Sequence, residues 1–294
     1  MKLGIVGLNN FDNGHPFSFS AIVNGYNKKY FKKSKFKNIL KYLQLKSKKN
    51  FGISNVKITH AWTQDPKITK SLCKSCYIKN CLKNYKDMVG EIDALIIARD
   101  DLHYTISKYF LKRKIPVFVD KPLTTNKKEF NFFKKYIKSG MLMSTSGLRF
   151  SKEINILKNK IKSVGKLKII NACVVNDFEK YGIHMLDILD ELKVLKVKKI
   201  VKSKKTEIVS YYCNNGLLIN IFCLGKVSKI FNLHVVGSKR SLNIDINDNF
   251  IAFKNTLIAF VKMVKTKKPI INPASTINVI NLLISTMEKK NVKV

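Results

Sequence analysis

One lysine of this chain stands where its amine could take part in chemistry. Lys121 follows the apolar residues 116–119 and Asp120, and it precedes Pro122. The apolar run predicts a buried strand, so Lys121 would lie at a strand end, unlike most lysines of this lysine-rich chain. Partial desolvation there would lower the pKa of its amine, which could then hydrogen-bond a reacting hydroxyl or carbonyl oxygen.

A second group suited to proton transfer is His184, which begins a predicted helix after Tyr181-Gly182-Ile183. An imidazole titrates near neutral pH and can accept or return a proton. The alternative is a histidine on the buried face of a helix, with no part in the chemistry.

A glycine closes the first predicted strand, residues 2–7. A strand-end glycine before a helix is where the pyrophosphate of a dinucleotide meets a helix N-terminus. The usual pattern of three glycines is absent, because Asn9 takes the second place and the loop runs on through Asn10 to Gly14. Gly7 therefore predicts a cofactor loop, with a plain strand-to-helix turn as the alternative.

Asp65 follows the second predicted strand, residues 56–62. A carboxylate there can accept both ribose hydroxyl groups of a dinucleotide, and it favours NAD because it repels a 2′-phosphate. The alternative is a turn aspartate in front of Pro66.

Three of the six cysteines, Cys73, Cys76 and Cys81, form a C-x2-C-x4-C cluster. A metal or iron–sulfur site usually needs four ligands, and no fourth cysteine or histidine is near in sequence. We expect reduced thiols, no metal and no disulfide framework.

The elements that would position these residues begin with alternating strands and helices. This order predicts a parallel sheet of the Rossmann type with right-handed crossovers. The predicted elements are strands at 2–7, 56–62, 92–98, 116–119 and 141–146 and helices at 18–26, within 28–50, at 102–112 and near 126–138.

After about residue 165 the pattern changes to short strands separated by turns, which predicts an open, largely antiparallel sheet in a C-terminal α/β domain. We place the boundary after Pro122, giving domains 1–122 and 123–294, with the last helices free to pack on either. The predicted elements are strands at 166–175, 197–201, 207–213, 217–223, 230–236 and 241–246, and helices from near 182, at 251–266 and at 274–288.

Several of these segments, taken in order, resemble the Gfo/Idh/MocA oxidoreductases, the family of glucose-fructose oxidoreductase and inositol dehydrogenase. The most specific landmark is the Asp120-Lys121-Pro122 segment, which resembles the family's Glu-Lys-Pro motif. The other landmarks are residues 92–98 followed by His103, residues 146–150, residues 181–187 and residues 269–273.

The resemblance implies hydride transfer between NAD or NADP and a sugar, keto sugar or polyol, including one linked to a nucleotide or phosphate. It also implies a cis bond between Lys121 and Pro122. The implied catalytic residues are Lys121, His184 and Tyr181, the substrate contacts Arg149 and Lys180, and the cofactor contacts Gly7, Asn9, Asn10, Asp65, Ala98, Arg99, His103, Asp120 and Lys121.

The chain departs from the family four residues before His184, where Lys180 replaces an aspartate. Tyr181 or Lys180 would then share the proton transfer, which suits reduction of a keto sugar. The same departure leaves open a non-catalytic NAD(P)-binding regulatory or assembly protein. Arg149 has an alternative too, since it could simply pair with a carboxylate.

The net charge of +37 arises from 56 Lys and Arg residues against 19 Asp and Glu residues. Only four of these cations are arginines, and no nucleic-acid-binding motif is present. We therefore expect a solvated basic surface and no nucleic-acid partner. No secretion signal and no apolar run of about 20 residues stands out, so we expect a cytoplasmic protein. The outer face of the sheet in the second domain is a natural dimer surface, and we expect a homo-oligomer.

Overall fold

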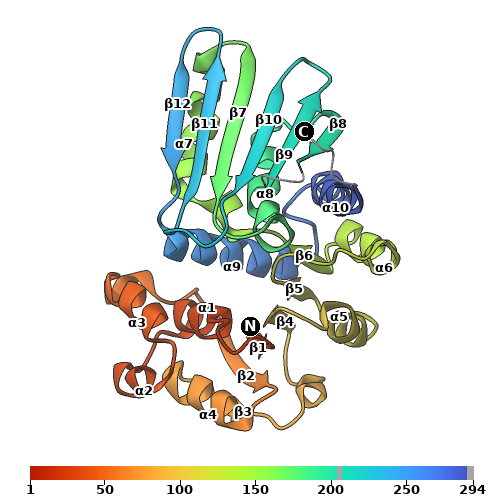
Figure 1. The fold of residues 1–294 in the computed structure, drawn as a ribbon. Coiled ribbons are helices and arrows are strands. Elements are labelled where there is room, and N and C mark those ends of the chain that lie inside the picture. The colour runs from red at the N-terminus through yellow and green to blue at the C-terminus, as the bar shows by residue number, and fades with distance from the viewer. Residues whose placement is uncertain (204–206, 290–294) are drawn as a thin grey trace. The chain divides into compact units, whose positions relative to one another are not determined.

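The computed structural model describes residues 1–203 and 207–289. They form two compact units, each built around a six-stranded sheet (Figure 1). The first unit comprises residues 1–124, 128–144 and 253–271, and the second comprises the remaining described residues.

The first sheet is parallel throughout and has the strand order β3-β2-β1-β4-β5-β6. The two halves of the sheet diverge from β1 and β4, which is where open parallel sheets bind ligands at the carboxyl ends of their strands. The strands are β1 (Lys2–Leu8), β2 (Lys57–Thr63), β3 (Asn80–Cys81), β4 (Ala94–Arg99), β5 (Val117–Val119) and β6 (Leu142–Ser144).

The central strands of this sheet are buried on both faces, as the continuous apolar run at 94–98 predicts. Helices pack on them, with α1 against β1 and β2 and α5 against β4 and β5. The helices and short 3-10 turns of this part are α1 (His15–Asn24), α2 (Lys28–Lys33), α3 (Lys37–Gln44), η1 (Lys48–Asn50), α4 (Pro66–Ser75), η2 (Tyr85–Met88), α5 (His103–Leu111) and α6 (Lys127–Lys138).

The second sheet has the order β12-β11-β7-β10-β9-β8. Among the strands of the described residues, only β10 and β7 pair in parallel here, so the sheet is mixed and mostly antiparallel, as predicted. The strands are β7 (Leu167–Val174), β8 (Val197–Lys202), β9 (Ile208–Cys213), β10 (Leu218–Cys223), β11 (Phe231–Gly237) and β12 (Ser241–Asp245).

Alternate residues of the second sheet point into a core, with Ile219 and Ile221 of β10 fully buried. Helices α8 and α10 pack together beside this core. The remaining elements are η3 (Gly147–Phe150), α7 (Lys152–Lys160), η4 (Ile161–Val164), the π-helical turn η5 (Phe178–Gly182), α8 (Ile183–Glu191), α9 (Asn249–Thr266) and α10 (Pro273–Glu288).

The boundary of the units differs from the predicted one after Pro122. Strand β6 pairs in parallel with β5, so the first sheet keeps the chain as far as Ser144. Most of α9 also belongs to the first unit, where Phe260 meets Phe118 of β5. None of the described helices is long and apolar enough to cross a bilayer.

Candidate oxidoreductase site

The loop between β1 and α1 has the form that a dinucleotide requires. Gly7 cannot carry a side chain, because a Cβ there would lie 2.3 Å from Cγ of Pro16. Gly14 precedes α1 and offers no capping side chain, and the first turn of α1 holds no acidic residue. The N–H of His15 donates to Oδ1 of Asn13 at 3.0 Å and Pro16 has no N–H, so this helix start favours a pyrophosphate through its dipole and through the close approach at Gly7.

The departure from the glycine pattern is accommodated by unusual backbone angles. Leu8 and Asn9 both have φ of 79°, in the region that glycine adopts most readily. Asn10 turns the loop, since its Oδ1 accepts the N–H of Asp12 at 3.0 Å. Asn9 and Asn10 are exposed at the carboxyl end of β1, where the sequence predicts cofactor contacts.

Asp65 begins α4 as its N-cap, with Oδ1 accepting the N–H groups of Lys67 at 2.7 Å and Ile68 at 3.2 Å. This is the turn aspartate that the sequence offers as the alternative to a ribose-binding acid. One oxygen of the carboxylate makes both bonds, so a ribose contact through the other oxygen stays a prediction.

At the end of β4, Ala98 and Arg99 are buried. Nε of Arg99 donates to Oδ1 of Asp101 at 2.5 Å, and its guanidinium lies 5.6 Å from the ring centre of Trp62. His103 begins α5, and its ring bridges the carbonyl oxygens of Arg99 at 2.6 Å and Pro122 at 3.0 Å. His103 thus ties the end of β4 to the lysine–proline segment.

Lys121 lies two residues beyond β5, half-buried, and its bond to Pro122 is cis, as the resemblance implies. Asp120 is 7% exposed and is bonded to Nδ1 of His15 through Oδ2 and to the N–H of Lys121 through Oδ1 at 2.9 Å. Burial alone would raise the pKa of Asp120, but His15 and Lys121 outweigh it and bring the pKa to about 2. Asp120 is therefore a fixed negative charge beside the lysine.

In the second unit, His184 is buried at the start of α8, and its Nδ1 lies 2.6 Å from Oγ of Ser146. The N–H of Ser146 in turn donates to Oδ2 of Asp187 at 2.6 Å. Burial raises the pKa of Asp187 to about 6, although Arg149 and the N–H of Ser146 act to lower it. Because Ser146 engages one ring nitrogen, the imidazole has a defined orientation, as a general acid or base needs.

Tyr181 belongs to η5, one turn before His184, with ring centres 5.5 Å apart. Lys180 is exposed, and its backbone N–H donates to Oδ1 of Asp177, which caps the turn. Both residues that the sequence offers as substitutes for the missing aspartate thus lie on the turn that leads into His184.

Arg149 is buried among carboxylates. Its Nη2 bonds Asp190 and lies 3.4 Å from Asp187, and its Nη1 reaches Glu191 at 3.3 Å. The guanidinium is 4% exposed, and the carboxylates raise its pKa although burial opposes them. These contacts confirm the alternative that Arg149 pairs with a carboxylate, and a substrate contact stays a prediction.

The structure gathers the predicted residues in two sets. The cofactor residues and Lys121 lie in the first unit, beyond the carboxyl ends of four neighbouring strands. Arg149, Lys180, Tyr181 and His184 lie in the second unit on η3, η5 and α8. Cooperation between Lys121 and His184 therefore stays a prediction.

The sequence prediction missed His15 and Ser146. His15 directly follows Gly14 at the start of α1, and a histidine at the mouth of a cofactor loop is a usable signal. Ser146 lies in a segment that resembles the family, but its bond to His184 spans 38 residues of sequence. Only the folded chain could reveal that pair.

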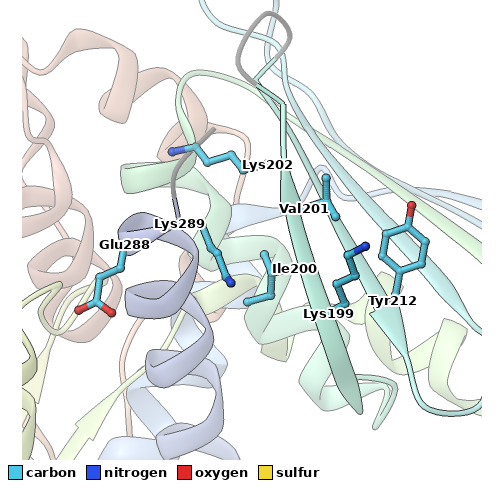
Figure 2. Close-up of a pocket in the computed structure, with 7 residues that line it drawn as sticks. All are labelled: Lys199, Ile200, Val201, Lys202, Tyr212, Glu288 and Lys289. Atoms are coloured by element: carbon cyan, nitrogen blue, oxygen red, sulfur yellow. The ribbon is translucent and has the colours of Figure 1, made fainter. Parts of the chain in front are cut away.

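Two other features of the described residues lie apart from the predicted site residues. Among the described residues no cluster of His, Cys, Asp and Glu could hold a metal, and burial raises the pKa values of Cys73 and Cys76. A pocket of about 640 Å³ lies at the edge of the second sheet, where Figure 2 shows Lys289 of the chain end turned towards Ile200 of β8. None of the predicted site residues lines this pocket.

Comparison with known proteins adds to the geometry of the first unit. Residues 1–145 match a family described as an oxidoreductase family with an NAD-binding Rossmann fold. No curated protein matches the chain by sequence.

Solved structures match over almost the whole chain. Myo-inositol 2-dehydrogenase from Lactobacillus plantarum is 16% identical, with a TM-score of 0.73, and the match covers 98% of this chain and 96% of that one. Scyllo-inositol dehydrogenase from Lactobacillus casei, with bound NAD(H) and scyllo-inositol, is 14% identical with a TM-score of 0.75 over 98% and 96% of the two chains. An oxidoreductase from Agrobacterium radiobacter, in complex with NAD+, L-tartaric acid and magnesium, is 13% identical with a TM-score of 0.72 over 98% and 95%. At these identities the likeness concerns the fold alone.

Proposed function

Because the chain belongs, through residues 1–145, to the Gfo/Idh/MocA oxidoreductases with an NAD-binding Rossmann fold, we propose that it is an NAD(P)-dependent dehydrogenase or reductase acting on a sugar, keto sugar or polyol. The observation that carries the proposal is the position of Lys121. It follows the buried strand β5, and it lies at the carboxyl ends of the parallel strands, as the Gly7 loop does. An amine there lies on the side of the sheet at which Rossmann domains bind their cofactor.

In the first unit, Gly7, Lys121 and Asp120 have separate roles in this proposal. Gly7 lets the helix start approach closely, and the positive end of the α1 dipole would favour the pyrophosphate there. Hydride chemistry would be supplied by a nicotinamide held at this loop. Lys121 hydrogen-bonds the reacting oxygen, while Asp120 stays ionised through His15 and keeps the charge near the lysine balanced.

The second unit carries a group of its own that is suited to proton transfer. His184 is oriented by Ser146, and Tyr181 is its neighbour one turn earlier. When a keto group is reduced, the new alkoxide needs a proton donor, and an imidazolium or a tyrosine hydroxyl can serve. When a hydroxyl is oxidised, the same imidazole acts as the base.

A polyol or sugar is the favoured substrate because a chain of the same fold binds NAD(H) together with scyllo-inositol. A nucleotide- or phosphate-linked sugar also suits a chain with a net charge of +37. NAD is the favoured cofactor, because the matching family is NAD-binding and a chain of the same fold binds NAD(H), and NADP is the second candidate.

The first test is a fluorescence titration of the protein with NADH and with NADPH. We expect at least one of them to bind below millimolar concentration, and the absence of binding by both would refute the proposal. Binding without turnover on a broad panel of keto sugars and polyols would favour a non-catalytic, regulatory member of the family.

A second test uses Lys121→Ala once a substrate is identified. We expect turnover to fall by at least about 100-fold, because a positioned proton-transfer group contributes that much, while cofactor affinity stays within several-fold. Lys112→Ala, an exposed lysine after α5, is the matched control. Retention of most of the activity by Lys121→Ala would remove this lysine from the mechanism.

We also propose a homo-oligomer formed through the outer face of the second sheet. On four neighbouring strands, the positions that alternate with the core residues carry no Asp, Glu, Lys or Arg, in a chain with 75 charged residues (56 + 19) among 294. The exposed charged residue on these strands is Lys168 at the start of β7, and Lys199 of β8 lies near the ring of Tyr212. An uncharged face lets two strongly cationic copies approach each other. These positions are Ile169, Asn171, Cys173, Ile208, Ser210, Tyr212, Leu218, Asn220, Phe222, Asn232, His234 and Val236.

A further inference from the structure

The cofactor loop adopts a backbone shape that its residues do not favour. Leu8 and Asn9 both have φ of 79°, where a side chain crowds the backbone and glycine is the usual residue. Asparagine tolerates this region better than leucine does. Other contacts must therefore hold the loop in this shape before any cofactor arrives.

Gln64 supplies the contact that Asn9 needs. Its Oε1 accepts the N–H of Asn9 at 3.1 Å, and its Nε2 donates to the carbonyl oxygen of Asn9 at 2.9 Å. One planar amide thus pairs both backbone groups of the residue that replaces the second glycine. Gln64 directly follows Thr63, the last residue of β2, which is the strand partner of Gly7.

The opposite side of the loop is held from β4. The N–H of Asp100 donates to the carbonyl oxygen of Leu8 at 3.1 Å, and Oδ1 of Asp100 accepts Nδ2 of Asn13 at 3.0 Å. The loop is therefore tied to both strands that flank β1, and Gln64 is its tie on the β2 side.

We propose that Gln64 is a positioning residue, which takes the place of the missing glycine by holding the cofactor loop in its binding shape. The inference rests on the proposed binding of NAD(H) or NADP(H). Holding the loop in advance lowers the entropy lost on binding, because fewer conformations are then given up. Since Gln64 occupies the N–H of Asn9, this N–H is not offered to the pyrophosphate.

The test compares Gln64→Ala with the wild-type protein, using NADH or NADPH, whichever the wild type binds more tightly. Loss of the two hydrogen bonds is expected to raise the Kd about tenfold. Gln44→Ala, an exposed glutamine at the end of α3, is the matched control and should leave the Kd unchanged. A Kd for Gln64→Ala within about twofold of the wild type would overturn the inference, since the expected effect is about tenfold.

A rescue separates positioning from general damage. Asn9→Gly in the Gln64→Ala protein places glycine at the unfavourable backbone angle, so the loop no longer needs the amide. We expect the Kd to return to within about threefold of the wild type. A double variant that binds no better than Gln64→Ala would also overturn the inference.

A readout without cofactor completes the experiment. Amide hydrogen exchange at Asn9 should be faster in Gln64→Ala than in the wild type, because its N–H loses its acceptor. Unchanged exchange would count against the inference. If the wild type binds neither cofactor, the proposed function fails. If the wild type binds and Gln64→Ala binds equally well, only the role of Gln64 fails.

Discussion

Asp120 shows how one side chain can be prepared for a role beside a lysine. It stands where the family has glutamate, and its shorter carboxylate reaches both His15 and the backbone of Lys121. The sequence places the residue at a strand end, but its histidine partner lies 105 positions away in the chain. The contact follows from the sheet, which brings the end of β5 beside the start of α1.

The ionised state of Asp120 gives a stability that depends on pH. Its pKa of about 2 in the folded protein lies below the ordinary value of 3.8. A lowered pKa contributes stability above pH 4, and this contribution is lost as the pH falls towards 2, where the folded state also takes up the proton. The shift corresponds to about 2 kcal/mol.

We therefore expect Asp120→Asn to lower the free energy of unfolding by about 2 kcal/mol at pH 7 and by much less near pH 2.5. Urea unfolding at pH 7, 4 and 2.5 measures both values. Asp12→Asn is the control, since Asp12 is exposed and its nearest cation, Lys35, is 3.9 Å away. An equal loss at all three pH values would show that the carboxylate acts through packing instead.

At the scale of elements, the meeting of β1 and α1 depends on one glycine. A Cβ on Gly7 would meet Cβ and Cγ of Pro16, which are parts of a rigid ring at the helix start. Helix α1 would have to shift. On the same strand a Cβ on Gly4 would meet Sδ of Met88 at 2.6 Å and Cδ1 of Ile92 at 2.7 Å, which are ends of flexible side chains.

Gly7→Ala should thus destabilise the protein by about 1–3 kcal/mol and weaken cofactor binding at least about tenfold. Gly4→Ala, the matched control, should cost less and leave cofactor affinity unchanged. Thermal unfolding and the NADH or NADPH titration check the two effects. Equal behaviour of the two variants would mean that α1 tolerates the shift.

The second unit joins η3 to α8 through the ion cluster of Arg149. Removing the arginine leaves Asp187, Asp190 and Glu191 without their shared cation. The pKa of Asp187 is raised from 3.8 to about 6 in the folded protein. Ionisation of Asp187 therefore lowers the free energy of unfolding as the pH rises between these two values. Without Arg149 the pKa of Asp187 rises further. The loss in the free energy of unfolding then becomes larger and continues to a higher pH.

We expect Arg149→Met to lower the free energy of unfolding by about 3–5 kcal/mol at pH 8 and by less at pH 5, where Asp187 is protonated. Urea unfolding at both pH values measures the difference, and Asp187→Asn in the same protein should restore part of it. Arg240→Met, at an exposed arginine, is the control. A loss independent of pH would contradict the role of the charges.

At the scale of the whole molecule, charge decides how copies meet. The uncharged outer face of the second sheet includes Phe222 of β10, whose strand partners are Ile208 and Cys173. The positive charges on the rest of the surface make two copies repel each other. Salt screens this repulsion, so it should strengthen self-association.

Phe222→Lys should yield a monomer by light scattering under conditions where the wild type is an oligomer. Asn214→Lys, in the turn between β9 and β10, adds the same charge away from this face and should not do so. A wild-type protein that is monomeric at both low and high salt would refute the interface.

The order and type of most elements could be predicted from the sequence, because a buried parallel strand and a half-buried antiparallel strand differ in apolar pattern. The patterns at 94–98 and 218–223 are local properties of the chain. Helices α2, α4 and α7 were not predicted separately, because each is short or mostly polar and lies beside a loop. The prediction also ended the first unit after Pro122, since strand pairing between β5 and β6 is not visible in sequence.

The sequence by itself determined the two kinds of sheet, the strand-end lysine and the glycine at the first turn, because each depends on neighbours a few residues away. Tertiary structure decided which partners those residues have: His15 for Asp120, Ser146 for His184, three carboxylates for Arg149 and Gln64 for Asn9. These pairs are 105, 38, 41 and 55 residues apart, counting Arg149 to Asp190. A hydrogen bond needs atoms within about 3 Å, and only the packing of strand ends and helix starts brings residues so distant in sequence that close.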